Sequence, residues 1–316
     1  MPNNGMHKTG FVLISVLWVT AMLTVIALGF GRRAALERRA SAYALDQAEA
    51  MLMARGAVER GIIELYNQRY MRMLLPEGQR GGDHCGQSWA KKKNLYTEGY
   101  FEKRENFDND EAAYIIIDED RYINVNAADE KILEEVKSLK RPVIRAINAR
   151  LNRAGGRGNE EYQPFNAVEE IRYLRGVTED NWFGSKNAPG LKNLLTVWGT
   201  AQINVNTASE EVLSCIPGLK KTEINAILRY RAGSDGVLYT DDDQGFEDMN
   251  DLLTKAGLSE SGSADWGAYC KFNASHFRIT GVATRRQGKV RAICSAIFAA
   301  GNYIQVLDWQ EKTLGS

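Results

Sequence analysis

One segment near the start of the chain restricts what the whole molecule can be. From Phe11 to Gly31 the sequence FVLISVLWVTAMLTVIALGFG runs for 21 residues without a charged side chain. At the helical rise of about 1.5 Å per residue it spans roughly 30 Å, the thickness of the hydrocarbon core of a bilayer. A cleaved signal peptide is the alternative, but its apolar region is shorter and ends at a site with small residues. Since this run continues into helix-forming sequence without a loop, we predict a transmembrane helix.

The charges that flank this segment favour one orientation. Four arginines follow it (Arg32, Arg33, Arg38 and Arg39), whereas Lys8 is the one lysine or arginine that precedes it. By the positive-inside rule, this asymmetry places the carboxyl-terminal bulk of the chain in the cytoplasm.

The residues directly ahead of the apolar run indicate the opposite orientation. Lys8-Thr9-Gly10-Phe11, followed by a long apolar helix, resembles the processing site of type IV pilins and pseudopilins. In that family a short polar leader is cut after the glycine, and the new terminal phenylalanine is N-methylated. The resemblance implies a leader over residues 1–10, cleavage between Gly10 and Phe11 by the prepilin peptidase, and a bulk that lies in the periplasm.

One position departs from the usual pilin pattern. Most pilins carry glutamate at the fifth mature position, where it neutralises a neighbour's amino terminus inside the filament, but here that position is Ser15. Within the family, this lack resembles the K-class minor pseudopilin of the type II (general) secretion pathway, which lies at the filament tip. The alternative is a tolerated membrane serine whose hydroxyl bonds to a carbonyl one turn back.

The helical pattern continues beyond the apolar run. No proline occurs between Pro2 and Pro76, so we predict one helix from Phe11 to Leu75, about 95 Å long. Half of it would lie in the membrane, and half would pack on a globular head. The apolar residues predicted to form the packing face are Leu45, Ala48, Leu52, Val58, Ile62 and Leu65.

An internal repeat occupies the middle of the chain. Ile123-Asn124-Val125-Asn126 returns 80 positions later as Ile203-Asn204-Val205-Asn206, and a second stretch that begins at Phe165 returns from Phe246. A period of this length indicates two copies of a small helical subdomain. Thr207-x-x-Glu210 reads as a capping box, and we expect the Asn-x-Asn lead-in to tie down helix amino termini.

The second copy also resembles the helix-hairpin-helix of DNA receptors and repair proteins, in which a Gly-apolar-Gly turn presents N–H groups to a phosphate. The corresponding turn, Gly218-Leu219-Lys220, lacks the second glycine, and the first copy has Ser138-Leu139-Lys140, which lacks both. Forty basic residues are balanced by forty acidic ones, which opposes a nucleic-acid footprint. The same motif in degraded form is a feature of the K-class insertion domain.

A loop in the second copy is strongly acidic. Five carboxylates lie within eight residues: Asp241, Asp242, Asp243, Glu247 and Asp248. Crowded oxygen ligands of this kind suit Ca²⁺, although the spacing is not that of an EF-hand. K-class insertions are known to bind calcium, so the resemblance implies a calcium site here. A solvated acidic loop without metal is the alternative.

The last fifth of the chain changes to alternating apolar and polar residues. The runs Ser275–Ala283, Val290–Phe298 and Tyr303–Trp309 predict an antiparallel meander, as in the K-class ending. Cys270 precedes the first run and Cys294 lies in the second, so a disulfide between them is geometrically conceivable in an oxidising periplasm. With Cys85 and Cys215 also present, all three connectivities remain open.

These observations predict an α+β, pilin-like fold: a long amino-terminal transmembrane helix, a small antiparallel sheet and a large α-helical insertion made of two repeats. The expected organisation is a leader over 1–10, a transmembrane segment over 11–31, a periplasmic helix, loop and first strands over 32–121, an insertion over 122–270 with repeats at about 122–183 and 202–267, and closing strands over 271–316.

The resemblance implies a minor pseudopilin of a type II protein secretion system, single-pass in the bacterial inner membrane, that caps the tip of the periplasmic pseudopilus and helps to initiate its assembly. The implied partners are the minor pseudopilins of classes I and J, other pseudopilins and the prepilin peptidase. Three scattered histidines and no nucleophile–base pattern predict no enzyme activity, and Asp83-His84-Cys85 has no second histidine nearby. The alternative function is a membrane-anchored DNA-binding or uptake protein.

Overall fold

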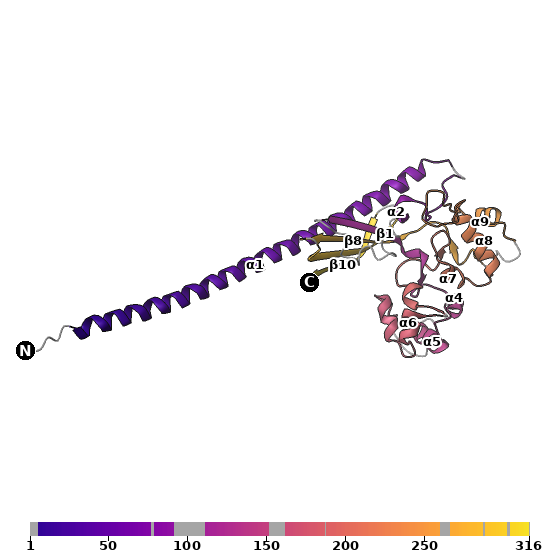
Figure 1. Cartoon of the computed structure of the whole chain (residues 1–316). Coiled ribbons are helices and arrows are strands. Elements are labelled where there is room, and N and C mark those ends of the chain that lie inside the picture. The colour runs from indigo at the N-terminus through magenta and orange to yellow at the C-terminus, as the bar shows by residue number, and fades with distance from the viewer. Residues whose placement is uncertain are drawn as a thin grey trace, which may run out of the picture.

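A single helix dominates the computed structural model of the chain (Figure 1). Helix α1 extends from Met6 to Met73, which gives it a length of about 100 Å. The structure describes residues 6–76, 79–91, 111–151, 162–186, 188–259, 266–286, 288–301 and 304–315. The helix ends two residues earlier than predicted, because Pro76 disfavours helical geometry in the residue before it.

Four antiparallel strands form the sheet on which the second half of α1 packs. They are β1 (Glu111–Asp118), β8 (His276–Arg285), β9 (Val290–Ala300) and β10 (Ile304–Gly315), in the spatial order β1-β8-β9-β10. The core between helix and sheet includes Trp89, Phe277 and Phe298, each buried. The predicted pilin-like fold is therefore confirmed: a long apolar helix, an antiparallel sheet and a largely helical insertion.

The packing face of α1 agrees only in part with the predicted one, since Val58 and Leu65 are buried against the sheet as expected. Leu45 and Leu52 are exposed, while Ala50 and Ala54 are fully buried. Small side chains are needed there because the backbones approach closely: a Cβ on Gly281 of β8 would lie 2.2 Å from the carbonyl oxygen of Ala54. At this level of the helix the larger side chains of Leu45 and Leu52 consequently lie outside the core.

The head is inserted between two neighbouring strands of the sheet. Asp118 at the end of β1 is in register with Phe277 of β8, and nearly all of the chain between them forms the head. The helices of the head are α4 (Glu130–Glu135), α5 (Arg141–Arg150), α6 (Glu179–Phe183), α7 (Glu210–Leu213), α8 (Lys221–Arg231) and α9 (Met249–Ala256). Short 3-10 turns are formed by Glu119–Arg121, Val168–Tyr173 and Leu191–Asn193. The two-residue strands of the head are β2 (Ile123–Asn124), β3 (Gly184–Ser185), β4 (Ala188–Pro189), β5 (Leu195–Thr196), β6 (Ile203–Asn204) and β7 (Cys270–Lys271).

The two repeats have the same local architecture. In the first, β2 pairs in parallel with β5, and in the second, β6 pairs in parallel with β7. Asn126 donates to the carbonyl oxygens of Phe165 (2.9 Å) and Val197 (3.1 Å). Asn206 makes the equivalent bonds to Phe246 (2.8 Å) and Phe272 (3.0 Å). One continuous apolar core joins the two copies.

These bonds correct two details of the prediction. The second asparagine of each Asn-x-Asn holds a distant loop and not a helix amino terminus. The cap of α7 is Ser209, whose hydroxyl accepts from the Val212 N–H, and not Thr207. Thr207 instead donates to Asp118 of the sheet (2.6 Å), because β6 brings it against the end of β1. The capping box predicted at Thr207 is therefore wrong.

Candidate functional site

The apolar part of α1 stands clear of the rest of the chain. From Phe11 to Gly31 its side chains are exposed, apart from partial cover at Ser15, and among the described residues this is the one helix long and apolar enough to cross a membrane. Gly10 and Phe11 lie in uninterrupted helix. The Ser15 hydroxyl donates to the carbonyl oxygen of Phe11 (2.9 Å), so its polar group is satisfied one turn back within its own helix.

The junction between sheet and head is built on buried carboxylates. Asp83, in the loop after α1, accepts hydrogen bonds from Arg72 (2.5 Å), from Arg69 (2.9 Å) and from the N–H of Ala274 (2.9 Å). Asp83 is fully buried, whereas the two arginines keep 15 to 19% of their side-chain surface exposed. This triad fastens the end of α1 to the segment that leads from the head back into β8.

The turn after β1 provides three more buried acids. Asp118 accepts from Asn204 (2.8 Å) and from Thr207, and Glu119 accepts from Arg278 (2.6 Å). Asp120 accepts from Lys271 (2.9 Å) and from the Ser275 N–H (2.6 Å). Each carboxylate therefore connects the turn to a different part of the head or to β8.

Two of these acids have pKa values shifted in opposite directions. Burial, followed by the negative charge of Asp120, raises the pKa of Asp118 to about 7. Burial also acts to raise the pKa of Asp120, but the hydrogen bond from His276, the charge of Lys271 and the Ser275 N–H together lower it. The junction thus keeps Asp120 ionised next to a carboxyl that titrates near neutrality.

Asp83, His84 and Cys85 are each held by contacts within the protein. His84 accepts a hydrogen bond at Nδ1 from the Gly86 N–H (3.2 Å), and burial lowers its pKa to about 4. The Cys85 thiol lies 3.5 Å from a guanidinium nitrogen of Arg231 and bonds to the carbonyl of Asn206. In the described part of the chain, no group of three or more His, Cys, Asp or Glu side chains is arranged to hold a metal ion.

The five carboxylates proposed as calcium ligands are engaged by neighbouring groups of the protein, and only Asp242 and Asp243 share a donor, the Thr240 hydroxyl. Asp241 pairs with Lys91, and Asp242 accepts from the N–H groups of Ser234 and Asp235 and from Thr240. The remaining three each accept a backbone N–H: Asp243 from Tyr239 (2.6 Å), Glu247 from Gly81 (2.8 Å) and Asp248 from Asp251 (2.8 Å). As they lie here, they shape turns and cap α9 and do not converge on one point. Calcium binding stays a prediction.

The structure does not form the disulfide considered between Cys270 and Cys294. All four cysteines are free and buried. Cys270 pairs with Ile203 in the head, whereas Cys294 is in register with Gly281 in the sheet. The expectation fails because the two residues belong to different hydrophobic cores.

The amino termini of α5 and α8 offer fewer free N–H groups than a phosphate site of the helix-hairpin-helix type needs. At the start of α8 the Lys220 N–H donates to the carboxylate of Glu223 (2.6 Å), so the chain's own anion occupies that position. At the start of α5 the second helical residue is Pro142, which has no N–H to offer. Both observations oppose phosphate binding at the amino termini of α5 and α8.

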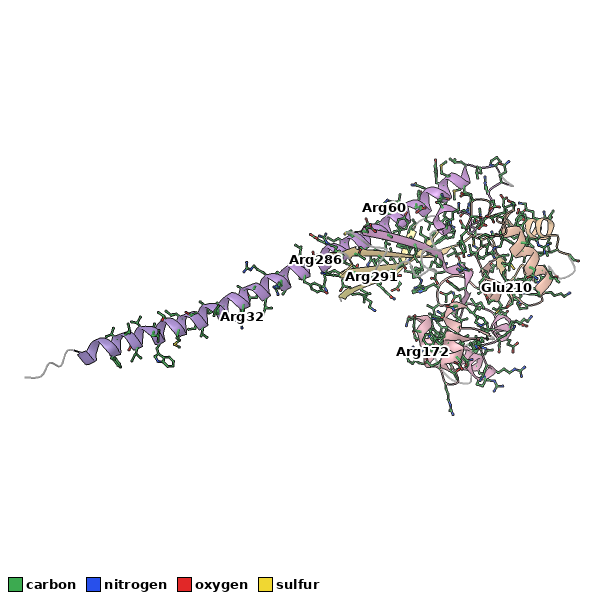
Figure 2. The ribbon with its side chains drawn as sticks, in the orientation of Figure 1. Arg32, Arg60, Arg172, Glu210, Arg286 and Arg291 are labelled. Atoms are coloured by element: carbon green, nitrogen blue, oxygen red, sulfur yellow. The ribbon has the colours of Figure 1, made fainter. Side chains whose placement is uncertain are left out.

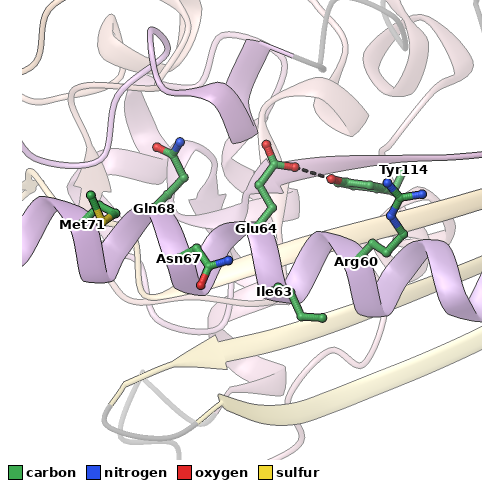
Figure 3. Close-up of a pocket in the computed structure, with 7 residues that line it drawn as sticks. All are labelled: Arg60, Ile63, Glu64, Asn67, Gln68, Met71 and Tyr114. Atoms are coloured by element: carbon green, nitrogen blue, oxygen red, sulfur yellow. Dashed lines mark hydrogen bonds between the residues drawn. The ribbon is translucent and has the colours of Figure 1, made fainter.

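Two grooves flank the second half of α1. The one beside β1 has a volume of about 450 Å³ and is shown in Figure 3, where Tyr114 of β1 donates a hydrogen bond to Glu64. It is lined by Arg60, Ile63, Glu64, Asn67, Gln68, Met71 and Tyr114. The other, of about 260 Å³, lies beside the turn into β10 and is lined by Leu65, Tyr66, Arg69, Tyr70, Met73, Ala300, Gly301 and Ile304.

Further apolar side chains of α1 and β10 are exposed outside the second groove. Arg55, one turn beyond Leu52, makes a two-pronged ion pair with Glu311 of β10 (2.6 and 2.7 Å), which fixes this side of α1 against the strand. We call the exposed apolar side chains on this side the α1–β10 surface. Its members are Leu52, Tyr66, Tyr70, Met73, Val306 and Trp309.

The junction between sheet and head was not predicted from the sequence. The one local signal for it in the sequence is the acidic run Asp118, Glu119 and Asp120, which follows the apolar residues of β1. Their partners lie about 80 to 160 positions further along the chain, for example Arg278 for Glu119. No local pattern connects residues at that separation.

The architecture is thus pilin-like, with a head inserted between β1 and β8 (Figure 1). No protein-family model matches the chain, and no curated protein matches its sequence. Among solved structures, it is similar to a chain in the crystal structure of the GspK-GspI-GspJ complex from the type 2 secretion system of enterotoxigenic Escherichia coli. The two are 12% identical, the match covers 80% of this chain and 96% of that chain, and the TM-score is 0.49.

Proposed function

We propose that this chain is a minor pseudopilin of a type II protein secretion system that caps the tip of the pseudopilus and helps to initiate its assembly. It would be anchored in the bacterial inner membrane by the apolar part of α1, with its sheet and head in the periplasm. Cleavage by the prepilin peptidase after Gly10 and methylation of Phe11 would precede assembly.

The observation that carries this proposal is the position of the head. The apolar part of α1 and the head lie at opposite ends of the molecule (Figure 1). In a filament of parallel helices whose apolar ends point to the base, the head would occupy the upper end. A second subunit stacked above would meet the bulk of both repeats, which supports a place at the end of the filament.

Ser15 supports the same position. A subunit inside the filament needs a carboxylate near the start of its helix to meet the charged amino terminus of a neighbour, because an unpaired charge at that depth is costly. The Ser15 hydroxyl is instead satisfied by Phe11 of its own helix. A subunit with no neighbour above it loses nothing by this replacement.

The α1–β10 surface supports contact with partner subunits. It lies on the same helix as the apolar segment, so a subunit whose own helix runs parallel to α1 would contact both. Exposed aromatic and aliphatic side chains such as Tyr66, Tyr70 and Trp309 are typical of surfaces that become buried in complexes. The minor pseudopilins of classes I and J are the proposed partners.

Removal of the head tests the proposal. Because Asp118 and Phe277 are in register on antiparallel neighbours, a short Asn-Gly turn can replace residues 119–276 and leave the sheet continuous. We expect the headless chain, in cells with the secretion system, to lose its restriction to the filament end. The control keeps the head and carries one substitution on β10, Gln305→Ala. A headless chain that still occurs at one end alone would contradict the steric argument.

The mature amino terminus tests the processing separately. Mass spectrometry of the membrane-extracted chain should find a methylated Phe11 at the amino terminus. A chain that begins at Met1, or one cut after Gly31, would contradict the pseudopilin proposal.

A further inference from the structure

The four arginines that follow the apolar segment are not used by any part of the proposed function. Arg32, Arg33, Arg38 and Arg39 lie within about 10 Å of helix, and with Glu37 they give this stretch a net charge of +3. All are exposed. The positive-inside rule alone would predict the opposite orientation for so basic a flank, so the cluster calls for a physical explanation.

The stretch of α1 that carries these arginines makes no packing contact with the sheet or head. None of residues 32–45 is buried. The sheet first meets α1 in an ion pair between Arg286 and Asp46 (2.5 Å), about 22 Å beyond Gly31 along the helix axis. Figure 2 shows Arg32 on this free stretch, whereas Arg286 lies just after β8, at the end of the sheet. The arginines therefore do not hold the body of the protein in place.

Their directions form a ring and not a patch. At about 100° per residue, Arg33, Arg38 and Arg39 project at about 100°, 240° and 340° from Arg32 around the helix axis. One of them, Arg33, pairs with Glu37 (2.9 Å), but both side chains stay more than 60% exposed. A protein partner contacts one side of a helix, whereas a ring of charge matches a surrounding that is the same on every side.

We infer that these arginines form a headgroup anchor, a ring that binds the phosphates of anionic phospholipids where α1 leaves the bilayer. Continuity with the apolar segment places the ring at the level of the headgroups. Guanidinium groups pair with phosphate through two parallel hydrogen bonds, which suits this partner. The anchor would hold the subunit in the membrane until assembly extracts it. The inference rests on the proposed membrane anchoring, not on the tip role.

The inference is tested on the full chain by measuring which lipid, anionic or zwitterionic, lies next to position 30. Phe30 is the last large apolar side chain before the ring, and Phe30→Trp with Trp18→Phe creates one tryptophan near that interface. The chain is reconstituted in phosphatidylcholine vesicles that contain phosphatidylglycerol. Quenching of the indole is then compared with bromine on the chains of either lipid. One arginine near an anionic surface favours contact by about fivefold, so the ratio of association constants should exceed about five and fall at 1 M NaCl.

Two matched sets of substitutions complete the test. Replacing the four arginines of the ring by glutamine should bring the ratio to about one, while replacing them by lysine should preserve it. The control replaces four exposed arginines of the head, Arg141, Arg145, Arg175 and Arg229, by glutamine and should change nothing.

Three outcomes would overturn the inference. A ratio near one in the parent chain would show no selectivity for anionic lipid. An unchanged ratio after the ring is neutralised, together with loss of a copurifying subunit, would assign the arginines to a protein partner. Absence of quenching by either lipid would show that the chain is not anchored in the membrane. This outcome distinguishes failure of the proposed anchoring from failure of the inference about the arginines.

Discussion

Asp83→Asn should destabilise the junction strongly. The carboxylate accepts three hydrogen bonds, two of them from Arg69 and Arg72, and it is fully buried. An asparagine presents an NH₂ group in place of one oxygen, so at least one donor faces another donor. Removing one partner of a buried ion pair costs about 3–5 kcal/mol. Because both arginines retain some exposure and can reach water, we expect the lower end, about 3 kcal/mol.

The assay is thermal unfolding of the full chain in detergent, followed by near-UV circular dichroism. Trp89 packs edge-on against Phe277 (5.4 Å between ring centroids), so its signal reports on this region. For a domain of this size, 3 kcal/mol corresponds to a fall in Tm of about 6–12 °C. Asp241→Asn removes an acid whose side chain is fully exposed beside Lys91, and serves as the control that should shift Tm little. If Asp83→Asn melts within about 2 °C of the parent chain, the triad does not hold the junction.

Three further predictions follow from named groups. Asp118 has a folded-state pKa of about 7, above the ordinary value for an aspartate, so its contribution to stability is fully present below about pH 4 and is lost as pH rises through 7. The Tm of Asp118→Asn should therefore fall less than that of the parent chain between pH 5 and pH 8, and parallel pH profiles would contradict this. Ser15→Glu should leave initiation impaired or unchanged and should never allow the chain to polymerise alone; filaments of the purified variant would refute the reasoning. Calcium at the acidic loop, Asp241 to Asp248, should raise Tm more than magnesium does. An unchanged Tm at millimolar calcium would contradict a calcium site in this loop.

The features that the sequence predicts well are those with local or periodic signals. The apolar run from Phe11 to Gly31, the absence of proline up to Pro76 and the repeated Ile-Asn-Val-Asn each depend on neighbouring residues or on direct self-similarity. The alternation in the last strands likewise predicts the meander that β8, β9 and β10 form. Together these are sufficient for the fold class.

The details that failed depend on contacts between distant residues. Leu45 and Leu52 were predicted on the packing face of α1, but the close approach of Gly281 to Ala54 selects small residues at that level of the helix. Thr207 has the sequence of a cap, yet β6 brings its hydroxyl to Asp118, and Ser209 takes the capping position. Cys270 and Cys294 are near in sequence but lie in separate cores.

The central claim is that this chain occupies the end of a pseudopilus. The most direct measurement is electron microscopy of purified filaments labelled with gold against the head, with the number of copies per filament determined by quantitative mass spectrometry. The account predicts label at one end alone, about one copy per filament, together with the minor partners. Label distributed along the shaft, with copies that increase with filament length, would contradict it.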